Sequence, residues 1–426
     1  MEQTKEKGQG VRRAVDTTRH HRENGWDYRG RAVYHFTFPV EGRFPLFGTL
    51  EGESAERAFI RLNPFGYRVY QILCGLPQFY AAKGFALKVL AQKVMPDHIH
   101  LVIQVLEPLP QSIGAVVRGF KSACTKVYKQ EFLSCGENAA EVHSRGEQQG
   151  NAAEMHGRAN QQENAAEVHG RGEQQGDAVE VHGRASQQGN AAALMHFARI
   201  FANRNSIWQQ DAAYYHERIL HAPGQLNRMI NYVKDNPRRL WLKKNNPDLF
   251  RLHRHTEVCG LSFTSLGNHF LLDWHDNQTV EMSRNATVEQ IRIRLQTAMA
   301  AAQNGAVTYT AAISKGEQLI ARTLRKQGYP LVVLLSDGFP KEGLPQERFY
   351  KPGGIYFEAC SRGQLLLLEP TEQTFLNEDI QSAVEGTLRR KAAERHYDYE
   401  QIPIKSQRYR FVALNEIAKR LARIER

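Results

Sequence analysis

Alternation of aromatic or β-branched residues with other types marks the first regular element of the chain. The segment RAVYHFTF, from Arg31 to Phe38, has the pattern of a half-buried strand. Hydrophobic spacing and turn residues then predict a helix at about 64–83, two strands at 86–105, a helix at about 111–132, an irregular segment and strand at 207–220, and a helix at about 224–236 that Pro237 should stop. Strands and helices in this order predict a small α+β domain.

A tandem repeat with a period of 13 residues interrupts this pattern. Its units, such as NAAEVHGRGEQQG, begin at Asn138, Asn151, Asn164, Asp177 and Asn190. Each unit carries one histidine, which is compatible with metal binding, but the long period brings no two histidines onto one strand or helical turn. We therefore interpret residues 136–195 as a disordered polar insert, too poor in apolar residues to form a core.

The pattern changes again beyond about residue 252. Short apolar strands now alternate with helices, which is typical of a parallel sheet. The expected elements are a helix at 288–302, a strand at 306–313, a helix at 315–327, strands at 329–335 and 364–368, and closing helices. We expect a basic arm at 1–27, one domain in two parts at 28–135 and 196–250, and an α/β Rossmann-like domain at 251–426.

Composition narrows the class of protein. The 426 residues include 41% hydrophobic ones, enough to fold, and carry a formal net charge of +11, which favours a polyanionic partner such as nucleic acid. The five cysteines show no C-x-x-C spacing, which predicts neither a disulfide framework nor a zinc ribbon. The chain shows neither a signal peptide nor an apolar run of about 20 residues. We expect a cytoplasmic protein with no membrane partner.

Two histidines stand two residues apart in the segment MPDHIHLVIQV, from Met95 to Val105. The period of a strand places His98 and His100 on one face and the alternating apolar residues on the other. Positions about 6.5 to 7 Å apart along a strand allow two imidazoles to converge on one divalent ion. The alternative is a pair of surface histidines with no ligand, because a chain with 17 histidines is expected to hold such a pair by chance.

A tyrosine-bearing helix is the expected partner of these histidines. Its apolar residues at 226, 229, 230 and 233 form a buried stripe, and Tyr232 and Asn236 lie one turn apart on the flank of that stripe. A phenol needs help to attack at neutral pH. A nearby metal that polarises the phosphate, with the Asn236 amide as a further oxygen ligand, would supply it. The alternative is a tyrosine that merely packs.

Several segments in one order resemble REP-associated tyrosine transposases, relatives of small single-strand transposases with a His-hydrophobic-His motif. The resemblance covers about residues 28–245 without the insert, and rests on Arg31 with Tyr34–Thr37, Met95–His100, Gly119–Ser122, Ile207–Gln209 and Tyr232–Pro237. It implies a ferredoxin-like antiparallel sheet that bears the histidines on a central strand. It also implies that His98, His100 and Asn236 bind the metal and that Tyr232 is the nucleophile.

The resemblance further implies a substrate and a reaction. Family members act on single-stranded DNA with hairpins at repeated palindromes, through a covalent 5′-phosphotyrosine that leaves a free 3′-hydroxyl. The insert and the C-terminal domain depart from the compact pattern of the family, which leaves open whether this copy is active or adapted to another role.

Basic residues interleaved with aromatic ones surround the expected site in the sequence. Such mixtures neutralise phosphates and stack unpaired bases, although a solvated basic surface is the alternative. The candidates for DNA contact are Arg12, Arg13, Arg29, Arg31, Lys121, Arg238 and Arg239.

The C-terminal domain offers a weaker candidate site. Ser314, Lys315 and Gly316 lie where a strand meets a helix, and backbone amides there could take a phosphate. Lys351 and Gly353 belong to a glycine-containing segment near the end of a neighbouring strand, where open α/β sheets bind ligands. A nucleotide is one candidate ligand, although no standard phosphate-loop pattern is present.

We predict a metal-dependent single-stranded DNA transposase or recombinase, with Mg²⁺ or Mn²⁺ as cofactor and single-stranded or hairpin DNA as partner. The C-terminal domain would modulate it or bind DNA. The alternative is a hairpin-DNA binder or nucleotide-responsive regulator with vestigial catalytic residues. Monomer and homodimer stay open, and with them the use of Tyr232 in its own or a partner subunit.

Overall fold

The computed structural model describes residues 25–133, 206–209, 216–336, 339, 355–396 and 398–423. The expected repeat insert and most of the basic arm lie outside these residues. The chain divides into two units, Met1–Trp241 and Leu242–Arg426. The division falls earlier than the boundary we expected after residue 250, because Leu242, Leu249 and Phe250 pack into a core of the second unit.

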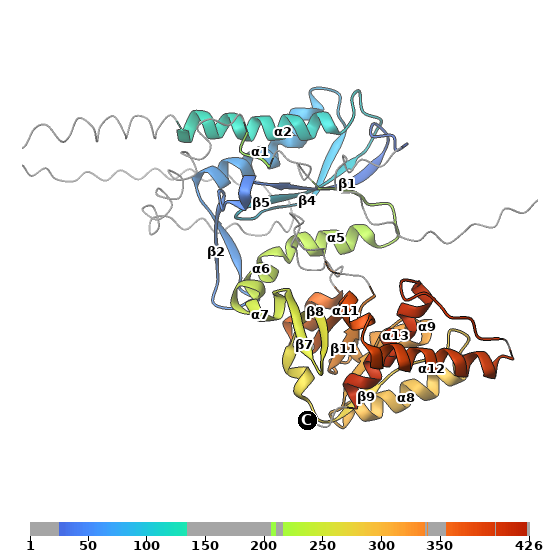
Figure 1. Cartoon of the computed structure of the whole chain (residues 1–426). Helices are drawn as coiled ribbons and strands as arrows, with labels where there is room; N and C mark the ends of the chain where they lie inside the picture. Colours follow the sequence, from blue (N-terminus) through green and yellow to red (C-terminus); the bar gives the residue numbers. More distant parts are fainter. Residues whose placement is uncertain are drawn as a thin grey trace, which may run out of the picture. The chain divides into compact units, whose positions relative to one another are not determined.

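The first unit is built on a four-stranded antiparallel sheet with strand order β4-β5-β1-β6 (Figure 1). Along the chain the elements are β1 (Ala32–Pro39), α1 (Pro64–Ala81), β4 (Leu87–Val94), β5 (His98–Val105), α2 (Gly114–Val127) and β6 (His216–Ile219). This β-α-β-β-α-β sequence and strand order define a ferredoxin-like fold. The predicted α+β class with a ferredoxin-like sheet is therefore confirmed.

One face of the sheet forms the main core of this unit. The alternation of β1 buries Tyr34, Phe36 and Phe38 completely, and the apolar positions of β5 join them under α1 and α2 (Figure 1). Helix α1 starts where the sequence signals it, with Pro64 in the first turn and the Asn63 side chain accepting a hydrogen bond from the Gly66 amide.

The opposite face of the sheet is covered by α5 (Gln225–Lys234), which packs Leu226, Met229 and Val233 against it. The prediction that Pro237 stops this helix needs correction. Helix α5 already ends at Lys234, and α6 (Asn236–Asn245) begins at once with Pro237 in its first turn. Proline is tolerated there because the first amides of a helix have no intrahelical acceptor.

Short elements complete the first unit. They are the 3₁₀ helix η1 (Glu41–Arg43), the hairpin of β2 (Gly48–Glu51) and β3 (Phe59–Leu62), and the π-helical turn η2 (Tyr128–Leu133). The last of these replaces the end of the α-helix that we expected to run to about residue 132.

The second unit contains a six-stranded mixed sheet with strand order β7-β8-β12-β11-β10-β9. Its strands are β7 (His253–Val258), β8 (Leu261–Gly267), β9 (Asn277–Thr279), β10 (Val307–Thr310), β11 (Leu331–Leu334) and β12 (Leu365–Pro370). Strands β9 to β12 are parallel, as predicted for a Rossmann-like domain. The antiparallel hairpin of β7 and β8 was not predicted.

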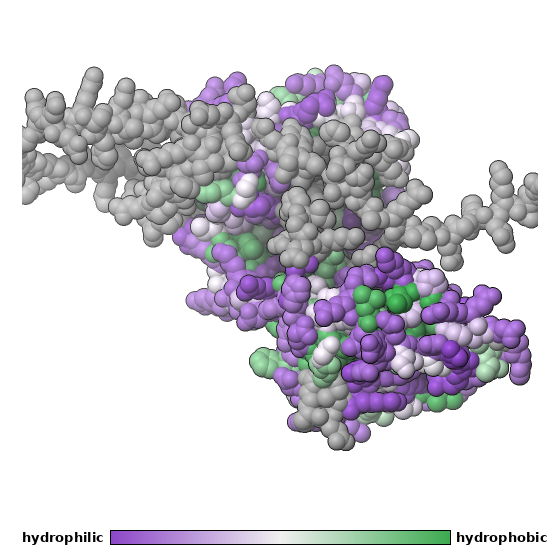
Figure 2. All heavy atoms as spheres, in the orientation of Figure 1, coloured by the Kyte–Doolittle hydropathy of each residue, from purple (hydrophilic) through white to green (hydrophobic). Residues whose placement is uncertain are grey.

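Helices cover both faces of this sheet. They are α7 (Pro247–Phe250), η4 (His269–Asp273), α8 (Val288–Gln303), α9 (Lys315–Lys326), α10 (Ile355–Ser361), α11 (Glu372–Phe375), α12 (Glu378–Glu394) and α13 (Gln407–Ala422). Helices α12 and α13 pack in one core cluster with one set of alternating strand residues. Helices α7, α9 and α10 pack in a second cluster with the other set, which points to the opposite face of the sheet. Hydrophilic side chains dominate the face of this unit seen in Figure 2. Among helices of the described residues, none has the length and apolar character needed to cross a bilayer.

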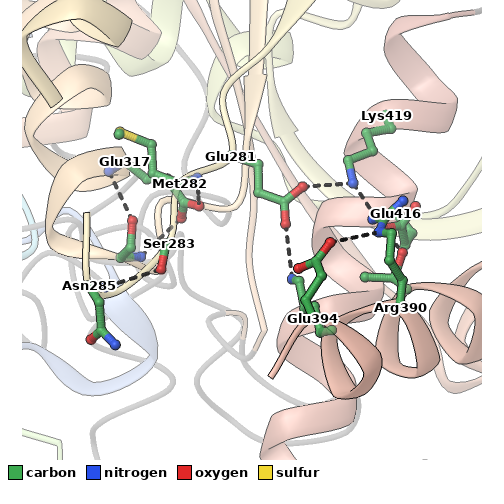
Figure 3. A network of polar contacts seen from close by, with 12 residues as sticks. Glu281, Met282, Ser283, Asn285, Glu317, Arg390, Glu394, Glu416 and Lys419 are labelled. Atoms are coloured by element: carbon green, nitrogen blue, oxygen red, sulfur yellow. Dashed lines mark hydrogen bonds and ion pairs between the residues drawn. The ribbon is translucent and has the colours of Figure 1, made fainter. Parts of the chain in front are cut away.

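A polar network fastens α12 and α13 to the segment that follows β9 (Figure 3). Glu281 lies 2.7 Å from the Lys419 ammonium of α13 and 3.4 Å from that of Lys391 in α12. Glu416 lies 2.9 Å from the same Lys419 ammonium and also accepts a hydrogen bond from Thr387. Burial would raise the pKa of Glu281, but its bonds to Lys419 and Lys391 outweigh this effect and hold the pKa below its usual value.

We expect Glu281→Gln to destabilise the second unit by about 1 to 2 kcal/mol at neutral pH, because it removes the carboxylate that Lys391 and Lys419 share and leaves Lys419 with Glu416 alone. The wild-type contribution should begin to fall as the pH drops below about 4.5 and be lost as the pH passes through the lower folded-state pKa of Glu281. Urea unfolding at pH 7 and at a series of lower pH values measures both effects. Glu289→Gln, which alters an exposed pair with Arg292, is the control and should change nothing; equal losses in the two variants would contradict the assignment.

Candidate active site

The face of the sheet below α5 carries the two histidines of β5. Burial of Ile99, Leu101 and Ile103 in the main core leaves His98 and His100 on the opposite face, as the strand period predicted. The register of β1 against β5 pairs Thr37 with His100 and His35 with Val102. Residues opposite each other across two strands project to the same face. His35 and Thr37 therefore lie beside the histidine pair.

The two histidines of β5 meet at their outer ring nitrogens. His98 Nε2 and His100 Nε2 are 3.1 Å apart, with the ring planes nearly perpendicular. An octahedral ion with ligands at about 2.1 Å separates two adjacent donor atoms by about 3.0 Å. The spacing of the two nitrogens therefore suits neighbouring positions around one small divalent ion.

Asp97 fixes the orientation of the first histidine. Its Oδ1 lies 2.5 Å from His98 Nδ1, and its Oδ2 lies 3.4 Å from Arg43 Nε. Burial would raise the pKa of Asp97, but the hydrogen bond and charge of His98, with the Arg43 guanidinium, outweigh it and lower the pKa. A carboxylate at Nδ1 holds the proton on that nitrogen and leaves the Nε2 lone pair for a cation.

Two side chains of β1 contact the inner nitrogen of the second histidine. His100 is only 3% exposed, and its Nδ1 lies 3.0 Å from His35 Nε2 and 3.0 Å from Thr37 Oγ1. The His35 and His100 rings are stacked, with centroids 5.1 Å apart. The inner end of His100 is thus held by polar groups, while its outer end faces His98.

Helix α5 brings Tyr232 to these rings. The Tyr232 ring centroid lies 5.5 Å from that of His100 and 6.4 Å from that of His35, edge-on in both cases. Its neighbour Val233 is fully buried against the sheet, whereas Tyr232 itself is 37% exposed. The structure therefore brings together three side chains that the sequence analysis linked: His98, His100 and Tyr232.

Asn236 lies at the junction of α5 and α6. Its Nδ2 donates a hydrogen bond of 2.8 Å to the Tyr232 carbonyl, which leaves the amide oxygen as the group able to bind a cation. Within the described part of the chain, no group of three or more His, Cys, Asp or Glu side chains could hold a metal ion. Among the described residues, the His98–His100 pair therefore has no third ligand of these four types.

The predicted DNA-contacting residues lie in different environments. Arg239 places its guanidinium 5.3 Å from the centre of the Tyr232 ring, and Arg238 pairs with Asp235 at 2.6 Å. Arg29 donates to the Leu109 carbonyl and Arg31 is exposed. Arg12 and Arg13 lie outside the described residues.

Lys121 lies inside the first unit rather than on its surface. It is 3% exposed, with its ammonium 5.8 Å from the centre of the Trp208 ring, and burial lowers its pKa to about 7. Its carbonyl accepts a hydrogen bond from Trp208 Nε1. The segment that contains Lys121 therefore ties α2 to the end of β1, where Trp208 bridges to Val40.

In the second unit, the predicted phosphate position is already engaged by a side chain. The buried Glu317 carboxylate accepts hydrogen bonds from the amides of Ile313 and Ser314. It also accepts one from the amide of Met282 (Figure 3). A β-carbon on Gly316 would meet the Met282 sulfur at 2.9 Å, so this glycine allows close packing. The side chain of Lys315 is exposed.

A cavity does lie at the expected edge of the sheet. It has a volume of about 270 Å³ and is lined by residues that follow β10 and β11, with Arg284, Gln318 and Phe411. Lys351 and Gly353 lie outside the described residues.

Three residues near the histidine pair were not assigned a role from the sequence: His35, Thr37 and Asp97. The alternation in Arg31–Phe38 does contain a signal for His35 and Thr37, because it places them on the face of the strand that does not carry the apolar Tyr34 and Phe36. The sequence gives no comparable signal for Asp97, whose contact depends on the turn before β5.

Residues 73–145 match the family model described as "Transposase IS200 like". The matched stretch is well under half of the chain, and it contains the histidine pair but neither β1 nor α5. It supports a transposase-type role in DNA processing for the unit that contains it. No curated protein matches the chain.

Two solved structures show weak likeness. One is DNA processing protein A from Helicobacter pylori, described for its single-stranded DNA binding mode, with 17% identity over 28% of this chain and 54% of that one and a TM-score of 0.21. The other, a candidate transposase from Deinococcus radiodurans R1, has 12% identity over 50% of this chain and 95% of that one and a TM-score of 0.21. The chain spans about half of the Helicobacter protein, and neither likeness defines its fold.

We expect the full chain to bind Mn²⁺ in an isothermal titration, and His100→Gln to weaken binding at least about tenfold because one of the two imidazole donors is lost. His255→Gln, in the second unit, is the matched control and should bind as the wild type does. Unchanged affinity in His100→Gln would place the metal elsewhere.

Proposed function

We propose that the first unit is a metal-dependent, single-stranded DNA transposase that cleaves and rejoins DNA at hairpin-forming repeats through Tyr232. The observation that carries the proposal is the contact of the helix-borne Tyr232 ring with His100, whose outer nitrogen faces that of His98. The family match across the histidine pair supports it independently.

The proposed chemistry assigns each residue a task. His98, His100 and the Asn236 oxygen would hold a divalent ion, Mg²⁺ or Mn²⁺, which draws charge off the scissile phosphate when bound. The Tyr232 oxygen forms a bond to phosphorus as the bond from phosphorus to the 3′-oxygen breaks. The phenol proton passes to solvent and the departing 3′-oxygen takes up a proton from solvent, which gives a 5′-phosphotyrosine and a free 3′-hydroxyl. Attack by a 3′-hydroxyl, with loss of its proton, reverses the step and rejoins a strand.

The residues around Tyr232 suit the binding of single-stranded DNA. The Arg239 guanidinium beside its ring adds positive charge where a phosphate must approach. The partial exposure of Tyr232 leaves the phenol accessible to an unpaired strand. The alternative function, a hairpin-DNA binder with vestigial catalysis, would use the same surface without forming the covalent bond.

Incubation of the full chain with a labelled single-stranded hairpin and Mn²⁺, followed by a denaturing gel, tests the reaction. The wild type should form a covalent adduct and Tyr232→Phe should form none, because the substitution removes the hydroxyl that attacks phosphorus. Tyr67→Phe is a matched control, since Tyr67 is similarly exposed but lies on α1, which covers the other face of the sheet. Tight binding with no adduct in the wild type would favour the binder.

Arg239→Ala should weaken single-strand binding at all sequences alike and lower the slope of log K against log salt by about 0.7, the value for one phosphate contact. Fluorescence anisotropy at several salt concentrations gives the slope. Arg57→Ala, which removes an exposed charge beside Glu53, is the control for net charge. A slope that stays the same in Arg239→Ala would argue against a phosphate contact.

A further inference from the structure

His35 lies directly behind the histidine pair and takes no part in the chemistry proposed above. We infer that His35 is a positioning residue: together with Thr37, it determines which ring nitrogen of His100 carries the proton, and so prepares His100 to bind the metal ion. The inference rests on the proposed function because it concerns the same metal site.

The contacts of His35 place it in the interior of the site. Its side chain comes from β1, the strand next to β5, and the residue is 8% exposed. Its Nε2 faces His100 Nδ1 at 3.0 Å, on the side of the His100 ring away from His98. Thr37 Oγ1 reaches the same nitrogen at 3.0 Å. Two groups of β1 that can each donate or accept a proton thus converge on one atom.

The contact between His98 and His100 restricts the arrangement of protons when no ion is bound. In the neutral form of His98, the carboxylate of Asp97 keeps the single ring proton on Nδ1, so Nε2 carries a lone pair. His100 Nε2, 3.1 Å away, must then hold a proton to form a hydrogen bond with it. His100 Nδ1 becomes an acceptor, and His35 Nε2 or the Thr37 hydroxyl donates to it.

A bound ion requires the opposite arrangement at His100. Both Nε2 lone pairs must point at the cation, so the proton of His100 has to sit on Nδ1. His35 Nε2 or Thr37 Oγ1 must then accept it. The protons balance if His35 passes its Nε2 proton to His100 Nδ1, His100 releases its Nε2 proton to solvent, and His35 takes one up at Nδ1.

Imidazole suits this position because its two neutral tautomers offer either a donor or an acceptor at Nε2. An apolar side chain would remove one of the two contacts that β1 makes with the Nδ1 of the buried His100. A permanent charge next to the candidate site would either repel the cation or compete for it. The two rings are nearly parallel, with centroids 5.1 Å apart, and set His35 Nε2 next to His100 Nδ1.

Titration of Mn²⁺ into the full chain and two variants at this position tests the inference. His35→Phe keeps a ring but removes both nitrogens, and should lower Mn²⁺ affinity by about 10- to 100-fold. His35→Gln carries an amide that can donate or accept near the position of Nε2, and should recover most of the loss. Adding Thr37→Val to His35→Phe should weaken binding further, because the second of the two β1 contacts of His100 Nδ1 is removed as well.

Nuclear magnetic resonance of the histidine ring nitrogens supplies a second readout. In the wild type, diamagnetic Mg²⁺ should move the His100 proton from Nε2 to Nδ1, whereas in His35→Phe the shift should be incomplete at the same Mg²⁺ concentration. Val33→Ala is the matched control, since Val33 lies two residues away on the same face of β1 and packs on the α5 side. It should leave Mn²⁺ affinity unchanged.

The outcomes separate the inference from the proposed function. Equal Mn²⁺ affinity in the wild type and His35→Phe would overturn the role of His35 and leave the metal site intact. Equal losses in His35→Phe and His35→Gln would show that only the shape of the ring matters, which also overturns it. A wild-type chain that binds no Mn²⁺ would overturn the metal site and the inference together.

Discussion

The packing of α5 on the histidine face of the sheet is the contact on which the candidate site depends. Tyr232 and His100 lie far apart in the sequence, and the described structure joins them through apolar side chains, chiefly Val233 against Val102 and Leu220. Burying one such side chain contributes roughly 1.5 to 3 kcal/mol. Because Val233 adjoins Tyr232 in the helix, the packing that anchors one also fixes where the other lies.

Local periodicity explains why much of the site could be predicted from the sequence. The two-residue period of β5 determines that His98 and His100 share a face, and the apolar stripe of α5 determines which side of that helix meets the sheet. Both rules act within one element. The family resemblance then linked the two elements, which periodicity alone could not have done.

The partners of His100 depend on pairing between strands, which local pattern does not encode. Thr37 stands opposite His100 only because β1 and β5 pair in one register, and a shift of one residue would turn His35 and Thr37 to the other face. The hairpin of β7 and β8 was not predicted because its turn residues give no usual turn signal. Its turn uses Cys259 and Gly260, both with positive φ, and Cys is not a residue that normally signals such a turn.

Several segments that carry the family resemblance have packing roles rather than chemical ones. A β-carbon on Gly119 would lie 2.0 Å from the Tyr80 hydroxyl, so glycine here allows α1 and α2 to approach. The Trp208 indole donates to the Lys121 carbonyl in the interior. Such residues maintain the packing of the fold, so they would be kept in a protein that had lost catalysis. Under the proposed function, the histidines, Asn236 and Tyr232 are the positions expected to distinguish an active copy.

The same distinction applies to the helix start in the second unit. A strand followed by a serine-capped helix resembles an anion site, yet Glu317 places its own carboxylate on the amides that a phosphate would use. An anion at this position would have to displace a buried carboxylate that has three amide donors. A ligand at this edge of the sheet would more readily use groups of the neighbouring cavity, where the Arg284 guanidinium lies over the Phe411 ring.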